Sequence, residues 1–252
     1  MKLVLLWVAC IVSIAVTAQS PITKSYTVKA GQKVNFDFDW PKVVVSVWDK
    51  NEVSVTAQVN INDGENNDAF TLEDKTEDGA LTISSRIKDL KNLPRRYSIT
   101  THDGKKTTFR SKEDLNEYRR KNEASYMYTS DGPDIDITIE VKIPASIATL
   151  VKTEFGSIDA KFDGNLKTPL ALYSKFGRVD VSVPAATNAD LKLKTEHGEI
   201  LASSLLKIDI ERDMKENLIK FSNKDIKGKL NGGGTELSLR SDFGKIYLRR
   251  AG

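Results

Sequence analysis

The side chains that could do chemistry are few and far apart. The chain has two histidines, His102 and His197, and one cysteine, Cys10. It lacks HExxH, GxSxG and P-loop motifs, and no GxGxxG precedes a helix. Asp131, Asp134 and Asp136 could suggest calcium, but their spacing is not that of an EF-hand loop. None of the acidic residues stands out as a paired carboxylate. We therefore predict no catalytic, cofactor-binding or metal-binding residues and no cofactor.

An internal repeat is the strongest pattern. Four segments share an aliphatic residue, a Ser or Thr, an aromatic residue and then a glycine, and the glycines are spaced by 21, 21 and 46 residues. The long gap leaves room for a degenerate copy near 219–226. A fixed period of this length predicts stacked coils. We expect each copy to be a strand, a corner that glycine allows to bend or bulge, and a second strand. The corner residues are Gly156, Gly177, Gly198 and Gly244.

The columns of the repeat suggest which side chains face inward. The aliphatic, hydroxyl and aromatic positions alternate with charged ones, so they share one parity and one strand face. The sequence thus predicts an inward aromatic column of Phe155, Phe176, His197 and Phe243. Stacking in chain order would place Lys175 between Glu154 and Glu196, and Arg178 beside Glu199. His197 fills an aromatic position in this column, which favours a packing role.

These repeats, with the strands before them, predict an all-β fold: a single-stranded β-helix or solenoid with coils of about 21 residues. Phe36–Trp40, Val43–Asp49, Val53–Val59 and Asp136–Pro144, with the closing Gly232–Gly234 and Leu239–Gly244, resemble the putative-adhesin family of bacterial envelope proteins. The resemblance covers roughly 25–60 and 135–250. It implies a β-solenoid at the envelope and carries over no catalytic residue. Trp40-Pro41 stands where that family usually has a glycine corner.

The ends of the pattern divide the chain into four parts. Residues 1–18 read as a signal peptide: Lys2 precedes an apolar run, and Val16 and Ala18 precede the cleavage point. A retained anchor and lipidation at Cys10 are the alternatives. Residues 19–60 are expected to form N-terminal strands, a first coil and a cap, and 131–252 the solenoid repeats. Cleavage after Ala18 would leave no cysteine and hence no disulfide.

Between these parts, residues 61–130 read as a charged insertion. Residues 61–80 carry seven acids and one Lys, whereas 86–121 carry twelve Lys or Arg and five acids. A short helix is predicted near 112–121, with Ser111 as its N-cap. The charge is consistent with a solvated excursion whose halves partly neutralise each other. The alternative is a polyanion contact made by Arg95, Arg96, Lys105, Lys106 and Arg110.

Composition limits the possible functions. A formal net charge of +3 gives no argument for nucleic acid. Membrane contact is expected only through an uncleaved signal peptide. We expect a non-enzymatic, exported protein of the periplasm, outer membrane or cell exterior, an adhesin-like interaction scaffold for an unknown protein or glycan partner. Lys152, Tyr173, Lys194 and Arg240 form an outward column that could contact such a partner or be simply solvated. The alternatives are a periplasmic regulatory scaffold and a polysaccharide-active β-helix enzyme.

Overall fold

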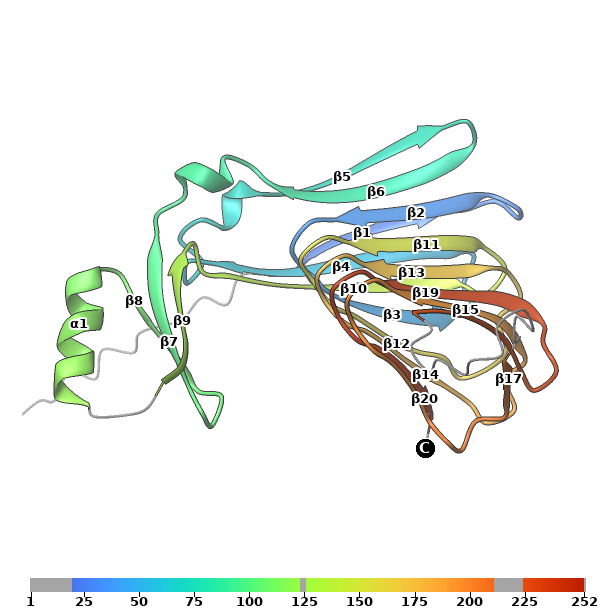
Figure 1. Ribbon diagram of the computed structural model, residues 1–252. Helices are drawn as coiled ribbons and strands as arrows, with labels where there is room; N and C mark the ends of the chain where they lie inside the picture. The colour runs from blue at the N-terminus through green and yellow to red at the C-terminus, as the bar shows by residue number, and fades with distance from the viewer. Residues whose placement is uncertain (1–19, 123–125, 211–223, 252) are drawn as a thin grey trace, which may run out of the picture.

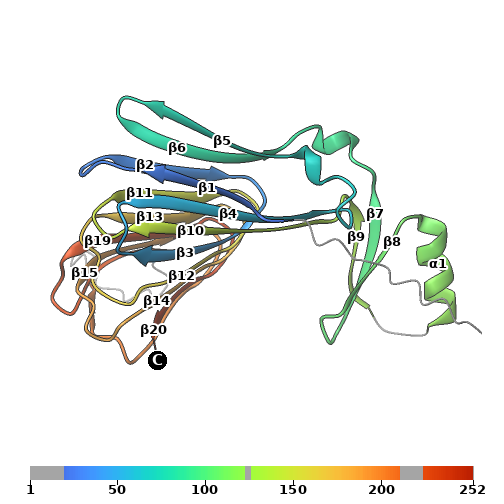
Figure 2. The same cartoon turned by 180° about the vertical axis from the view of Figure 1, so that it is seen from behind.

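The computed structural model describes residues 20–122, 126–210 and 224–251. Most of this part of the chain is β-structure in two large sheets that face each other, with a smaller unit projecting from one end (Figure 1; Figure 2 shows the reverse side). The predicted signal peptide lies outside the described residues, as does most of the predicted degenerate copy. The described residues hold no helix long and apolar enough to cross a membrane.

The first large sheet has eight strands. In spatial order they are β1 (Ile22–Thr27), β4 (Glu52–Ile61), β10 (Ile135–Pro144), β3 (Lys42–Trp48), β12 (Ile158–Lys161), β14 (Val179–Val183), β20 (Ile246–Arg250) and β16 (Ile200–Ala202). The strands from β10 to β16 run parallel, whereas β1 and β4 pair antiparallel with each other and β4 with β10.

The second large sheet has nine strands. In spatial order they are β17 (Ile208–Ile210), β18 (Asp225–Leu230), β15 (Ala189–Thr195), β19 (Thr235–Ser241), β13 (Leu170–Ser174), β11 (Ala148–Thr153), β2 (Lys33–Phe38), β6 (Ala80–Ile87) and β5 (Phe70–Glu77). It is parallel from β15 to β6 and antiparallel at both ends. The strands of the predicted copies thus do pair with one another in register.

The coils do not stack in chain order. The last copy, β19 and β20, lies between the second copy, β13 and β14, and the third, β15 and β16. Strand β18, which includes the end of the predicted degenerate copy, runs antiparallel to β15 and therefore is not a further coil. All-β structure is confirmed, but both large sheets are mixed, and the single-stranded solenoid that the repeat predicted is not shown.

The core lies between the two large sheets. Along β13, Leu170, Leu172 and Ser174 are buried while Ala171 and Tyr173 face outward. The same alternation recurs in β14 and β15 because successive side chains of a strand point to opposite faces. Fully burying one such leucine contributes about 1.5–3 kcal/mol. The inward aliphatic and hydroxyl columns of the repeat are therefore confirmed.

The two sheets meet at the end formed by β1 and β5. Lys24 Nζ donates to the carbonyl oxygen of Leu72 at 2.8 Å, and Tyr26 Oη donates to Asp74 at 3.1 Å. Burial and the Asp74 carboxylate raise the pKa of Tyr26. These contacts occupy polar groups of a sheet edge that would otherwise invite strand addition.

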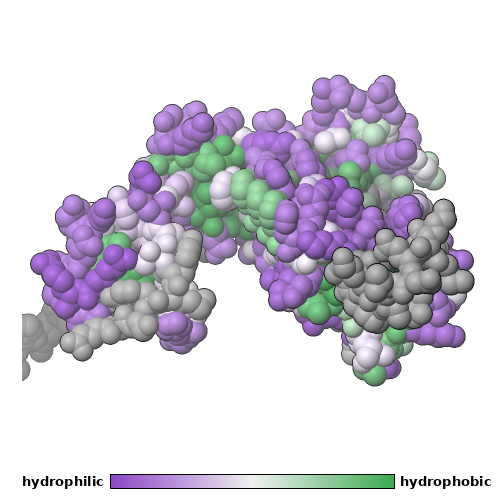
Figure 3. Space-filling model, viewed as in Figure 1, coloured by the Kyte–Doolittle hydropathy of each residue, from purple (hydrophilic) through white to green (hydrophobic). Residues whose placement is uncertain are grey.

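The charged insertion divides into two parts. Strands β5 and β6, which follow the 3₁₀ helix η1 (Asn67–Ala69), belong to the second large sheet and not to an excursion. After η2 (Leu90–Asn92) comes the projecting unit, a three-stranded sheet with one helix and a mainly hydrophilic surface (Figures 1 and 3). Its elements are β7 (Arg96–Thr101), β8 (Lys106–Phe109), α1 (Lys112–Lys121) and β9 (Tyr126–Gly132).

The predicted helix and its cap are both present. The Ser111 hydroxyl accepts a hydrogen bond from the backbone N–H of Asp114 at 3.0 Å. We expect Ser111→Ala to cost about 1 kcal/mol of helix stability, because that N–H loses its acceptor. Faster amide hydrogen exchange along α1 would report the loss. Asn116→Ala, an exposed change within the same helix, is the control and should not speed exchange; equal effects of both variants would contradict the capping role.

Candidate functional site

The aromatic residues of the repeat form a stacked column on the outside of the molecule. Phe155, Phe176 and Phe243 are 46%, 42% and 49% exposed, and His197 is also exposed. The predicted inward orientation is therefore wrong. The strands end at the Ser or Thr three residues before each corner glycine, so the chain bends before the ring and the alternation no longer applies.

Five rings make up this column, which we call the aromatic ladder: Trp40, Phe155, Phe176, Phe243 and His197. Neighbouring ring centroids lie 4.4, 5.1, 5.0 and 4.9 Å apart, with planes inclined by 9–19°. Such offset-stacked pairs contribute about 0.5–1.5 kcal/mol each. Each phenyl ring has a neighbour on both faces, so solvent meets mainly the ring edges along the ladder.

The corner glycines lie directly beneath the ladder and are packed backbone against backbone. A Cβ built on Gly177 would lie 2.0 Å from the carbonyl oxygen of Gly156. Gly156, Gly244 and Gly198 are similarly crowded by Pro41, Gly177 and Gly244. The predicted corner positions are confirmed. The reason for glycine is the close approach of neighbouring coils, because none of these four glycines has a positive φ angle.

Buried hydroxyl groups connect the corners. Ser174 Oγ accepts from the backbone N–H of Gly177 at 2.8 Å and donates to the carbonyl oxygen of Gly156, one coil away, at 2.7 Å. Ser241 repeats this arrangement between Gly244 and Gly177. Thr153 and Thr195 occupy the equivalent positions in the other coils. This hydroxyl relay holds the bends that present the rings.

Charged side chains flank the ladder. On the side of the second sheet, Lys175 pairs with Glu154 at 2.8 Å, as predicted. Glu196 pairs with Arg240 and not with Lys175, and Glu199 pairs with Lys245 and not with Arg178. Both predicted pairs are wrong because the last coil is inserted between the second and third. Exposed pairs of this kind contribute little stability, so they mainly set the charge pattern beside the rings.

One flanking group is nearly buried. Asp242 accepts hydrogen bonds from Tyr173 Oη at 2.6 Å and Arg240 Nε at 2.7 Å. Burial alone would raise the pKa of Asp242, but these two donors and the Arg240 charge outweigh it and lower the pKa. Arg240 also lies 4.7 Å above the Tyr173 ring. The outward column, which could contact a partner or be simply solvated, is therefore partly neutralised by the chain's own acids, and Lys152 likewise pairs with Asp37.

Tyr173 is expected to make the stability of the protein depend on pH in alkaline solution. Burial, and then the hydrogen bond to Asp242 and the charge of Asp242, raise the pKa of Tyr173 from 10.0 to about 12. The folded state therefore holds the Tyr173 proton more tightly than the unfolded state does. The contribution of Tyr173 to the free energy of unfolding is complete below pH 10 and is lost as the pH rises towards 12. We expect urea unfolding of Tyr173→Phe to depend less steeply on pH between 10 and 12. An unchanged slope would contradict this role.

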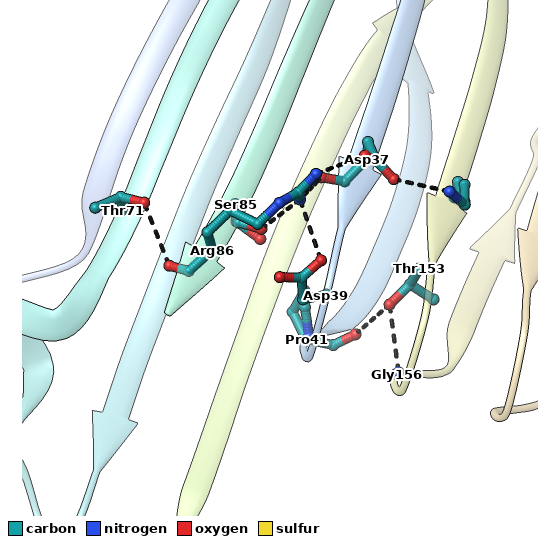
Figure 4. A network of polar contacts seen from close by, with 9 residues as sticks. Asp37, Asp39, Pro41, Thr71, Ser85, Arg86, Thr153 and Gly156 are labelled. Carbon is teal, nitrogen blue, oxygen red and sulfur yellow. Dashed lines mark hydrogen bonds and ion pairs between the residues drawn. The ribbon is translucent and has the colours of Figure 1, made fainter. Parts of the chain in front are cut away.

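A polar cluster lies near the end of the ladder that Trp40 forms (Figure 4). From β6, the Arg86 guanidinium reaches across to Asp37 Oδ2 at 2.6 Å and to Asp39 Oδ1 at 3.2 Å. Burial raises the pKa of Asp37, but Arg86 and Lys152 outweigh it and lower the pKa. For Asp39, burial together with the charges of Asp37 and Glu154 outweighs Arg86, and the pKa is raised. Among the described residues, the Asp39 carboxylate pairs with Arg86 alone.

The proposed polyanion-binding residues mostly have partners. Arg95 pairs with Asp131, Arg96 and Arg110 with Glu65, and Lys106 with Asp134. Arg96 is only 6% exposed. Lys105 is exposed. Four of the five cations are thus paired with three carboxylates, so the charge that this set leaves free for a polyanion is small.

The described part of the chain offers no metal site, and the hollow found there has no titratable group in its lining. No group of three or more His, Cys, Asp or Glu side chains there is placed to hold a metal ion. A hollow of about 160 Å³ is lined by Val28, Ala30, Asn51, Pro144, Ser146 and Ile147, none of which is titratable. The aromatic ladder with its flanking charges is therefore the candidate site.

Sequence reasoning missed the first ring of the ladder. Trp40-Pro41 was noted as a departure from the corner pattern, yet Trp40 stacks on Phe155 and Pro41 takes the place of the glycine. Aligning Phe38–Pro41 with Thr153–Gly156 puts an aromatic residue directly before both corner residues. That alignment was the available signal.

The fold and site define an all-β protein of two mixed sheets with stacked coils and an exposed aromatic ladder. No family model matches the chain, and no curated protein matches it. Two solved structures are similar: a putative cell adhesion protein from Clostridium sporogenes, with 11% identity and a TM-score of 0.45 over 92% of this chain and 100% of that one, and a putative adhesin from Bacteroides fragilis, with 9% identity and a TM-score of 0.22 over 92% and 98%. At these scores the likeness does not establish a shared function.

Proposed function

We propose that this chain is an exported, adhesin-like interaction protein of the bacterial cell surface that acts by binding and not by catalysis. The observation that carries the proposal is the aromatic ladder. Three phenyl rings in one regular column are each more than two-fifths exposed. Contiguous apolar patches rimmed by polar groups are typical of interaction sites.

The ladder is suited to contact because it is held rigidly. Its rings are stacked on one another, and their backbone is fixed by the hydroxyl relay. A pre-organised surface loses little conformational entropy when a partner binds. Charged groups on both flanks, such as Glu154 and Arg178, can fix the orientation of that partner.

The absence of catalysis is part of the proposal. Catalytic groups with shifted pKa values usually lie in clefts. Here Asp37, Asp39 and Asp242, whose pKa values are shifted, lie on the outer side of the second large sheet, in contact with arginines of the chain itself. Purified protein should therefore leave envelope glycans uncleaved, and measurable cleavage would overturn this part.

Location is tested in cells. A tagged chain expressed in a Gram-negative host should be found in the envelope fraction and be removed by protease added to intact cells. A periplasmic regulatory scaffold, the competing hypothesis, would be protected until the outer membrane is opened. A cytoplasmic chain that keeps its first 18 residues would overturn the export proposal.

Binding through the ladder is tested with matched variants. Phe155→Lys places a charge within the ladder, and Leu150→Lys makes the same kind of change at a 39% exposed position on the outer face of β11. Purified wild-type protein should adhere to envelope preparations from its host. Phe155→Lys should reduce adherence about tenfold while Leu150→Lys does not, with both variants folded by circular dichroism. Equal adherence of both variants would contradict the role of the ladder.

A further inference from the structure

Trp40 differs from the other rings of the ladder. Phe155 covers one of its faces at 4.4 Å, on the side of β11. No second ring and no cation of the described chain covers the other face. By contrast, Lys50 lies over Trp48 at 4.8 Å, and Arg249 over Tyr247 at 4.5 Å. The second face of Trp40 thus has no aromatic or cationic neighbour among the described residues, and the residue is partly exposed.

Hydrogen-bonding groups of both kinds lie next to Trp40, because Asp39 precedes it in the chain and contacts Arg86 of the neighbouring strand β6. The Asp39 carboxylate contacts the Arg86 guanidinium at 3.2 Å and, among the described residues, no other donor. Burial and the neighbouring carboxylates raise the pKa of Asp39. Arg86 lies on β6, on the side of β2 opposite to β11. Its Nη1 donates to the carbonyl oxygens of Asp37 and Ser85 and its Nη2 to Asp37 Oδ2, which leaves Nε and one Nη2 proton as donors for a ligand.

The charges of the cluster discriminate between ligands. Arg86, Lys152 and Lys175 balance Asp37, Asp39 and Glu154, so neither an anion nor a cation is favoured by net charge. A cationic side chain on the indole would lie next to the Arg86 charge, and a flat apolar ring would offer no donor to the Asp39 oxygen that does not contact Arg86. A sugar ring has an apolar face that packs on indole, with hydroxyl groups at its rim that both donate and accept.

We propose that the second face of Trp40, together with Asp39 and Arg86, is a subsite for one neutral pyranose ring of a glycan. This inference rests on the proposed binding function and gives it a ligand class. Asp39 would accept from a sugar hydroxyl, and Arg86 would donate to another sugar oxygen. One ring buries little surface, so affinity for a single glycan is weak, and many copies at a cell surface would bind by avidity.

The test is an array of neutral oligosaccharides probed with purified full-length chain, followed by NMR titration of the indole N–H signals with the bound sugars. We expect saturable shifts of the Trp40 signal and none of the Trp48 signal. Trp40→Ala should abolish binding, and Asp39→Asn, which keeps the shape of the side chain, should weaken it about tenfold. Tyr247→Ala, which removes an outward ring on the other large sheet, is the control and should bind normally.

Three results would overturn the subsite. They are an array with no bound neutral glycan, binding that survives Trp40→Ala, and a Trp40 shift produced by agmatine but by no sugar, which would indicate a cationic ligand instead. The experiments distinguish failure of the sugar subsite from failure of the proposed adhesin-like function. Cell-surface adherence that is lost in Phe155→Lys but unaffected by Asp39→Asn would leave an adhesin-like protein whose ligand is not a sugar at Trp40.

Discussion

Gly177→Ala is expected to destabilise the protein by about 3 kcal/mol. The new methyl group would lie 2.0 Å from the carbonyl oxygen of Gly156, which is backbone and cannot rotate away. Relief requires neighbouring coils to separate, which would strain the parallel pairing of β13 with β11 and of β12 with β14. Thermal unfolding should show a midpoint lower by roughly 6–12 °C.

Gly164→Ala is the matched control for this experiment. Gly164 is exposed, its φ angle is not positive, and a Cβ built there meets nothing within 4 Å. The same chemical change should therefore be neutral or slightly stabilising, because alanine restricts the unfolded chain. A small loss in Gly177→Ala, comparable with that in Gly164→Ala, would show that the coils do not pack as closely as the structure has them.

The sequence predicted the contents of each coil well. Corner glycines and inward hydroxyl and aliphatic columns recur in every copy, because each coil must match the backbone of its neighbour. The helix capped by Ser111 was also predicted, since a cap, an acidic first turn and a basic last turn are local signals. Local and repeated constraints leave a trace in sequence even without an alignment.

The order of the coils could not be predicted. Every copy presents nearly the same inward side chains, so β13 can accept either β15 or β19 as its neighbour. Charge did not decide between them either, since Lys175 would be complementary to Glu196 or to Asp242. The contacts that fix the order, from Tyr173 to Asp242 and from Arg240 to Glu196, join segments far apart in the chain.

The aromatic ladder was predicted with the wrong orientation for a related reason. Alternation was extended to the residue before each glycine, although the strand ends two residues earlier. The buried Ser or Thr turns inward to bond the corner, and the ring that follows is directed outward. A Ser or Thr three positions before a glycine is thus a signal for a bend. Such a bend explains why the aromatic residue directly before the glycine is exposed.

Ser174→Ala is expected to cost about 2–4 kcal/mol although it removes a single oxygen atom. That oxygen accepts from the N–H of Gly177 and donates to the carbonyl of Gly156, and Ser174 is fully buried. Without it, both backbone groups lose a partner where water cannot replace it. Ser238→Ala, an outward serine on the neighbouring strand β19, is the control and should change the free energy of unfolding by less than about 0.5 kcal/mol. Urea unfolding of the two variants compares them directly. Similar losses would mean that the hydroxyl relay does not hold the corners, and the rigid presentation of the rings would then have to come from stacking alone.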